Sequence, residues 1–260
     1  MAFLVILAGG FSRRFGQDKC TYVWRGRRFI DYVINAARGV ADRIYVAAGR
    51  NAHLYKGVEV LEDSGRFSGP LAAVDAAVRT VGGEIVFAPC DVPYVKPQVF
   101  EVLASTGGTA VWVYPNGRVE SMLFKIDSRG ALEALDLLAR YGRRRVDDLF
   151  RLGPTTFLST ARHGVDPRWL FNVNRLEDLG AVPSLKFEVF REDLWIEWGE
   201  PPLARWLVEN DVGALRGELL RYLEAGLFSM AAHVAKDLSK AWGNYGVLAE
   251  LLYGAVDIEK

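Results

Sequence analysis

Short apolar runs alternate with longer amphipathic stretches over the first 180 residues of the chain. Apolar runs of this length indicate strands buried on both faces, and a 3.6-residue apolar period indicates helices with one buried side. Strands are predicted at 2–7, 43–48, 58–61, 84–88, 110–114, 121–126 and 155–158. Helices are predicted at 29–38, 70–81, 97–104, 128–141 and 176–179. A further short helix is predicted to follow 143–145 and to end at residue 150. Strands that alternate with helices are typical of a Rossmann-like α/β fold with a doubly wound, mostly parallel sheet.

The pattern changes after the segment Ala-Val-Pro-Ser at 181–184. Residues 187–195 are either a strand or an irregular piece. Helices with apolar residues at i, i+3 and i+4 follow near 203–209, 213–224, 229–241 and 245–252. We therefore predict two domains, a sheet domain at 1–183 and a small helical C-terminal domain at 184–260.

Residues 7–19 follow the first predicted strand and read Leu-Ala-Gly-Gly-Phe-Ser-Arg-Arg-Phe-Gly-Gln-Asp-Lys. Glycines let a backbone approach a ligand and direct successive N–H groups at it, while the arginines and the lysine supply positive charge. The loop is neither a Walker A loop nor a G-x-G-x-x-G fingerprint. A plain strand-to-helix turn would leave Ser12, Arg13 and Lys19 unexplained, so the loop predicts a polyphosphate site.

Two aspartates also follow predicted strands directly. Asp63 comes after 58–61 and Asp91 after 84–88. The carboxyl ends of parallel strands share one sheet edge, so both should lie near the glycine loop. A carboxylate there can bind Mg²⁺, although Asp91 before Pro93, and Asp63 before a serine, are also good turn formers.

The charge balance of the chain limits which kinds of partner it is expected to bind. The 32 basic and 32 acidic residues cancel, so nothing global suggests a nucleic-acid or membrane partner. Residues 186–260 carry 8 Lys/Arg and 13 Asp/Glu, which leaves about +5 for the rest, as suits phosphate binding. Cys20 and Cys90 are not spaced as metal ligands, and without a signal peptide we predict a cytoplasmic protein with both as free thiols.

The loop at 7–19 resembles the signature of nucleotidyltransferases that activate small phosphorylated molecules with NTPs. It is most similar to that of the molybdenum cofactor guanylyltransferases, or molybdopterin-guanine dinucleotide synthases. The resemblance continues at 62–64, 68–71, 89–94, 144–146, 171–174 and 177–179, and covers about residues 1–180.

This resemblance implies that GTP and Mg²⁺ bind in the loop. The residues implied to contact the nucleotide are Leu7, Ala8, Gly9, Gly10, Ser12, Arg13, Lys19, Asp63, Asn172 and Asn174. Arg13 and Lys19 would hold the phosphates, Asp63 would lie near the guanine, and Asp91 would bind Mg²⁺. Asn172 and Asn174 could instead be simple turn formers. Catalysis would rest on Arg13, Lys19 and Asp91.

The expected reaction is transfer of GMP from GTP to the phosphate of molybdopterin, with release of pyrophosphate. A phosphate nucleophile is already ionised at pH 7, so no general base is needed. This agrees with the lack of a convincing Ser/His/Asp set, and we expect His53, His163 and His233 to be surface or core residues. The run 143–145 is either a solvated helix start or a contact for the pterin phosphate.

Two departures from the family pattern leave alternatives open. Family members often have an asparagine after the second strand that helps to read the base, and here that region reads Val-Ala-Ala-Gly-Arg-Asn at 46–51. The acceptor-side motif is also altered, to Val119-Glu120-Ser121. The chain could therefore use GTP or CTP on a cobamide precursor or sugar phosphate, or be a non-catalytic nucleotide-binding adaptor. The C-terminal helices could serve self-association, delivery to a molybdoenzyme, or cover for the sheet.

Overall fold

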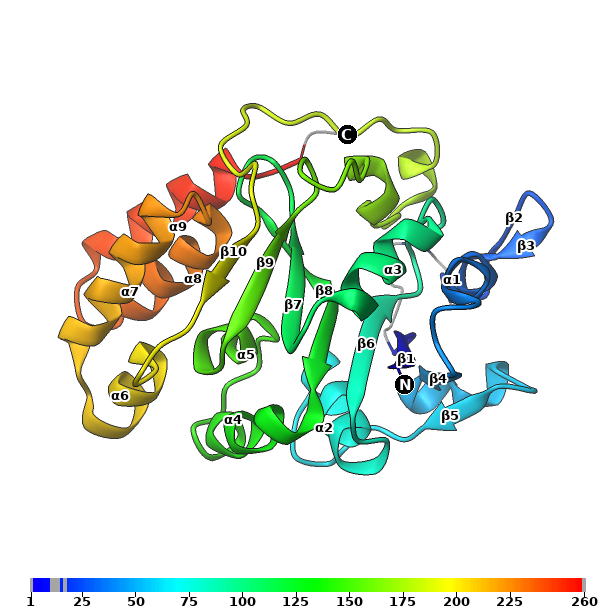
Figure 1. The fold of residues 1–260 in the computed structure, drawn as a ribbon, viewed down its shortest axis with the longest axis horizontal. Helices are drawn as coiled ribbons and strands as arrows, with labels where there is room; N and C mark the ends of the chain where they lie inside the picture. The colour runs from blue at the N-terminus through cyan, green and yellow to red at the C-terminus, as the bar shows by residue number, and fades with distance from the viewer. Residues whose placement is uncertain (1, 10–14, 16–17, 259–260) are drawn as a thin grey trace.

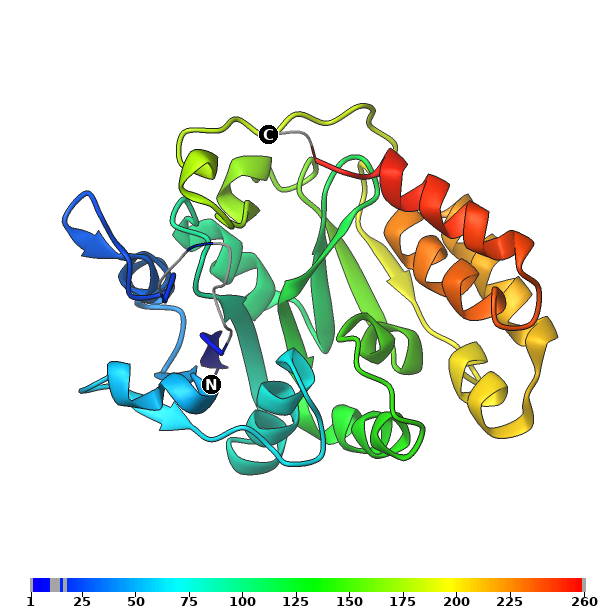
Figure 2. The same ribbon diagram turned by 180° about the vertical axis from the view of Figure 1, so that it is seen from behind.

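The computed structural model describes residues 2–9, 15 and 18–258 of the chain (Figure 1, Figure 2). Within these residues eight strands form one sheet in the order β10-β9-β7-β8-β6-β1-β4-β5. The strands are β1 (Ala2–Leu7), β4 (Arg43–Ala47), β5 (Glu59–Leu61), β6 (Glu84–Pro89), β7 (Thr109–Val113), β8 (Val119–Asp127), β9 (Thr155–Ser159) and β10 (Leu194–Ile196). A two-stranded hairpin, β2 (Val23–Trp24) and β3 (Arg27–Arg28), stands apart.

The sheet is parallel over β6, β1, β4 and β5 and between β7 and β9. Strand β8 is antiparallel to both β6 and β7, and β10 is antiparallel to β9. The expected Rossmann-like, mostly parallel sheet is confirmed, with β8 as the reversed strand in its middle.

Helices cover both faces of the sheet because successive strand residues point to opposite sides. In β1, Leu4 and Ile6 pack in one apolar cluster and Val5 in the other. The first cluster includes residues of α1 (Phe29–Ala37) and α3 (Pro97–Ser105). The second includes residues of α2 (Pro70–Thr80), α4 (Ser128–Arg140) and α5 (Asp147–Leu152). Short 3₁₀ helices are η1 (Gly49–Leu54), η2 (Pro167–Leu170) and η3 (Leu176–Asp178).

The C-terminal part is helical, as expected, and lies beyond the β10 edge of the sheet (Figure 1). Its helices are α6 (Pro202–Glu209), α7 (Val212–Glu224), α8 (Phe228–Leu238) and α9 (Asn244–Ala255). Tyr222 and Val234 are fully buried and belong to the same apolar cluster as Val5 and Phe87. The predicted domain boundary after residue 183 stays a prediction, and the apolar cluster is continuous across it.

A buried ion network joins α5 to α7 and α8. The Arg151 guanidinium is fully buried and donates to Glu218 at 2.7 Å, Asp237 at 2.7 Å and Asp148 at 3.1 Å. Arg143 donates to Asp148 and Asp237 at 2.7–2.8 Å. Burial disfavours these charges, yet the bound carboxylates raise the pKa of both arginines, and the guanidinium groups hold the pKa of Asp237 below its usual range.

This network corrects one expectation. Arg143 was expected to be part of a solvated helix start or a contact for the pterin phosphate. Its side chain is only 9% exposed, so it is not part of a solvated helix start, and its guanidinium bonds two aspartates. The neighbouring Arg144 is exposed, and Arg145 contacts His233 at 3.2 Å.

We predict that Arg151→Met lowers the free energy of unfolding by about 3–5 kcal/mol, because it leaves the buried Glu218 without a countercharge and leaves Asp148 and Asp237 with Arg143 alone. Urea unfolding measures the loss. Arg43→Met is the matched control, since it removes an arginine from the exposed pair with Glu59 and should cause no measurable change. Equal stability of the two variants would contradict the assigned role of the network.

Candidate active site

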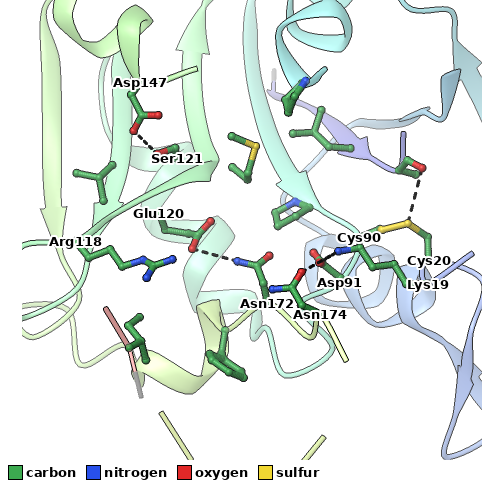
Figure 3. A pocket seen from close by; sticks show the side chains of 18 of the residues that line it. Lys19, Cys20, Cys90, Asp91, Arg118, Glu120, Ser121, Asp147, Asn172 and Asn174 are labelled. Atoms are coloured by element: carbon green, nitrogen blue, oxygen red, sulfur yellow. Dashed lines mark hydrogen bonds and ion pairs between the residues drawn. A yellow bond between two sulfur atoms is a disulfide. The ribbon is translucent and has the colours of Figure 1, made fainter. Parts of the chain in front are cut away.

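A cleft of about 620 Å³ opens where β1 and β6 end and β8 begins. Figure 3 shows its lining side chains. The predicted site residues among them are Leu7, Ala8, Gly9, Lys19, Asp91, Asn172 and Asn174. Further lining residues are Cys20, Cys90, Arg118, Glu120, Ser121, Asp147, Asp257 and Ile258. The structure therefore brings together seven of the residues that the sequence singled out.

Lys19 and Asp91 meet directly in this cleft. The Lys19 ammonium forms an ion pair with the Asp91 carboxylate and lies 3.4 Å from Asn174 Oδ1. Asp91 is only 4% exposed, and its carbonyl accepts a hydrogen bond from the Val173 N–H at 2.8 Å. Segments around residues 19, 91 and 174 thus converge, because all three are loops at one edge of the sheet.

The start of the glycine loop, Ala8 and Gly9, packs against the end of β4. The Ala8 N–H donates to the Ala47 carbonyl at 2.9 Å, and a Cβ on Gly9 would lie 3.7 Å from the same oxygen. Asp63 does not line the cleft. Its carboxylate lies beside Gly49, which has φ +50° and whose added Cβ would come within 2.8 Å of Asp63 Oδ2. Burial raises the pKa of Asp63, which flanks the loop from the β5 side.

Three predicted contacts, Gly10, Ser12 and Arg13, fall outside the residues that the structure describes. Their roles stay predictions. The catalytic set that can be placed is therefore Lys19 and Asp91.

Glu120 is a cleft residue that sequence reasoning treated only as a departure from the family pattern. It is 6% exposed and accepts a hydrogen bond from Asn172 Nδ2 at 3.2 Å. Burial raises its pKa to about 7, while Arg118 and Asn172 act in the opposite direction. Arg118 and Glu120 are two residues apart at the start of a strand and point the same way, and this alternation could have revealed them. Near neutral pH, Glu120 can therefore accept or release a proton.

Ser121, Asp147 and His233 form a polar chain along one wall. The Ser121 hydroxyl donates to Asp147, whose Oδ1 lies 3.3 Å from His233 Nε2. Burial alone would raise the pKa of Asp147, but His233 and Ser121 lower it to about 2. The carboxylate separates the serine from the histidine, so this is not a nucleophilic triad. His53 is exposed, and His163 contacts Asp193 at 2.9 Å.

Cys20 and Cys90 form a disulfide with a Cα–Cα distance of 5.3 Å. The prediction of two free thiols is therefore wrong. The sequence separation of 70 between the cysteines hid the pairing, whereas the fold seats the segment after the glycine loop against the end of β6. Each cysteine is the chain neighbour of Lys19 or Asp91, so the bond holds the backbones of that ion pair together.

The cleft suits Mg²⁺ rather than a metal held by the protein alone. Among the described residues no group of three or more His, Cys, Asp or Glu side chains could hold a metal ion. Asp91 and Glu120 offer carboxylate oxygens and Asn174 an amide oxygen. Mg²⁺ prefers such oxygen ligands and takes only one or two from the protein when substrate phosphates supply the rest.

Residues 4–154 match the family of MobA-like NTP transferase domains. The match covers more than half of the chain. The chain belongs to the MobA-like NTP transferase family. The MobA-like domain makes it a nucleotidyltransferase, as the glycine loop and the Lys19–Asp91 pair indicate chemically.

Known proteins similar to this MobA-like transferase agree. A molybdenum cofactor guanylyltransferase of Ectopseudomonas mendocina is 31% identical over 186 residues, which cover 69% of this chain and 90% of that protein. Another, from Mannheimia succiniciproducens, is 32% identical and covers 68% and 96%. The solved structure of molybdopterin-guanine dinucleotide biosynthesis protein A from Archaeoglobus fulgidus has a TM-score of 0.56 at 23% identity, covers 68% and 95%, and supports the fold. The expected family resemblance is thus confirmed.

We predict that replacing both cysteines, Cys20→Ser with Cys90→Ser, lowers the free energy of unfolding by about 2–4 kcal/mol, because the bond closes a long loop. Urea unfolding with and without dithiothreitol measures this. Reductant should destabilise the wild type to the level of the variant and leave the variant unchanged. If dithiothreitol left the free energy of unfolding of the wild type unchanged, the prediction would be contradicted.

Glu120 gives a pH-dependent prediction. The pKa of Glu120 is about 7 in the folded protein, against an ordinary value of 4.5, so the folded state binds the proton more tightly than the unfolded state does. This tighter binding stabilises the folded protein fully below pH 4.5. This contribution, roughly 3 kcal/mol, is lost as the pH rises through 7. Urea unfolding of wild type and Glu120→Gln between pH 4.5 and 8 should show their stability difference changing with pH, as the wild type alone loses this contribution. A pH-independent difference would show that the buried carboxyl is not protonated.

Proposed function

We propose that this protein is a Mg²⁺-dependent guanylyltransferase that transfers GMP from GTP to the phosphate of molybdopterin and releases pyrophosphate. The observation that carries the proposal is the convergence of Lys19 and Asp91 beside the glycine loop in a MobA-like domain. The names of the curated relatives support both the donor and the acceptor.

The residues of the cleft suit this reaction. Lys19 would exchange Asp91 for the triphosphate of GTP, and the loop N–H groups would orient it. Asp91 would hold Mg²⁺, which neutralises phosphate charge when bound. An oxygen of the acceptor phosphate forms a bond to the α-phosphorus, and the bond from that phosphorus to the bridging oxygen breaks. Pyrophosphate then leaves with the electron pair.

No general base enters this scheme, because the attacking phosphate is already ionised at pH 7. Glu120 is therefore given no proton-transfer role in the reaction, and the Asp147 carboxylate separates Ser121 from His233. Glu120 stands opposite Lys19 and Asp91 in Figure 3, on the side left for the acceptor.

We place the reaction in the cytoplasm, where GTP is abundant. Among the described residues no helix is long and apolar enough to cross a membrane. A disulfide in a cytoplasmic protein is unusual except in hyperthermophilic organisms, whose intracellular proteins are rich in disulfides.

We predict that Lys19→Ala and Asp91→Ala each lower the rate of pyrophosphate release from GTP and molybdopterin at least about a hundredfold, because Lys19 would supply positive charge to the triphosphate and Asp91 would hold the Mg²⁺ that neutralises it. Lys56→Ala, an exposed lysine away from the cleft, is the control and should keep full activity. Circular dichroism checks the fold of each variant. Full activity of either cleft variant would overturn the proposal.

A panel of GTP and CTP with molybdopterin, a cobamide precursor and a sugar phosphate tests the substrates. Turnover with GTP and molybdopterin supports the proposal. Turnover only with another pair would assign a related transferase, and nucleotide binding without any turnover would assign an adaptor.

A further inference from the structure

The segment Val256–Ile258 returns from α9 to the cleft. Figure 1 shows it running from the last helix back over the top of the sheet. Asp257 and Ile258 line the cleft, although they lie about 100 residues beyond the family match at residues 4–154. The C-terminal part therefore reaches the active site itself.

The turn between β7 and β8 is held by the C-terminal part. The Pro115 carbonyl accepts hydrogen bonds from Val189 and Phe190 at 2.7 and 2.9 Å. The fully buried Asn116 donates from Nδ2 to the Val256 carbonyl at 3.1 Å.

Gly117 of the same turn is also held by the C-terminal part. Its carbonyl accepts from the Ser229 N–H at 3.3 Å, and the Ser229 hydroxyl accepts from the Val119 N–H at 2.9 Å. A Cβ on Gly117 would lie 2.0 Å from the Gly226 oxygen, so only glycine fits there. The C-terminal part thereby sets the position of the turn and of the strand start that carries Arg118 and Glu120 into the cleft.

A second link runs through side chains. Ser121 and Asp147 line the cleft, and His233 of α8 bonds Asp147. Tyr253 of α9 contacts His233 Nδ1 at 2.6 Å. Helices α8 and α9 therefore support the same wall that the turn enters.

Arg118 places a positive charge on the wall of the cleft that the β7–β8 turn enters. Figure 3 shows its guanidinium directed into the cleft beside Glu120. It is 38% exposed and lies 3.4 Å from Asp257, whose side chain is 75% exposed. Such an exposed pair is weak, so a phosphate monoester with more negative charge can replace Asp257 as its partner.

We propose that the C-terminal part builds the acceptor half of the cleft, and that Arg118 binds the phosphate of the acceptor by exchanging Asp257 for it. This rests on the proposed function for the transfer reaction and adds the group that recognises the acceptor. It also assigns a role to the C-terminal part, which lies outside the family match at residues 4–154.

Kinetics with GTP and molybdopterin at low salt test the proposal. Arg118→Gln should raise the KM for molybdopterin at least tenfold and change the KM for GTP less than twofold. Asp257→Asn should lower the KM for molybdopterin about twofold to fivefold, because it removes the competing carboxylate. Arg129→Gln, a 90% exposed arginine on α4, is the matched control and should change neither.

Arg118→Gln and Asp257→Asn must shift the KM for molybdopterin in opposite directions. A pair that only stabilises the fold would shift both variants the same way, and that result would overturn the proposal. A rise in the KM for GTP alone in Arg118→Gln would also overturn it.

Hydrogen exchange provides a readout that does not need turnover. Molybdopterin, or the sugar phosphate of the panel, should slow exchange in a peptide covering residues 114–122 of the wild type, which carries Arg118, at least threefold, and GTP alone should not. If no nucleotide and acceptor pair turns over, the proposed function fails, yet slower exchange with a phosphate monoester would still support this acceptor site. Unchanged exchange with every acceptor would overturn it.

Discussion

Five buried charges between α5 and the C-terminal helices determine how the two parts of the molecule meet. Apolar packing across this junction is extensive but has no direction, so many arrangements would bury similar area. The guanidinium groups of Arg143 and Arg151 accept few geometries, because each must meet Asp148 and Asp237 at once. The network therefore fixes the orientation of the helices, and with it the turn that enters the cleft.

Much of the fold follows from local pattern. Strands buried on both faces and amphipathic helices have distinct periods, so their order indicates a mostly parallel sheet before any contact is known. The same reasoning brought the glycine loop, Asp91 and Lys19 together, because loops after parallel strands meet at one edge. Asp63 lies at the same edge of the sheet but does not line the cleft, because its strand is the last in the sheet.

Contacts that depend on the docking of the C-terminal helices could not be predicted. Nothing local distinguishes the buried Arg143 from the exposed Arg144, because the partners of Arg143 include a residue 94 positions away. His233 and Asp147 also meet only through the docking of α8. Strand β10 has three residues and is paired on one side, too short for a periodic signal. The acceptor side of the cleft depends on such contacts, whereas the nucleotide side depends on local loops.

The disulfide has a consequence for chain integrity. It closes a ring of backbone between Cys20 and Cys90 that contains α1, β4, β5 and α2. A single peptide-bond cleavage anywhere in this ring, by a protease or by heat, would leave one covalently connected molecule. The backbones that carry Lys19 and Asp91 would remain joined by their neighbours' sulfur atoms. Protection of this kind covers the chain between the two cysteines and extends neither to the glycine loop before Cys20 nor to the C-terminal helices, which lie outside the ring.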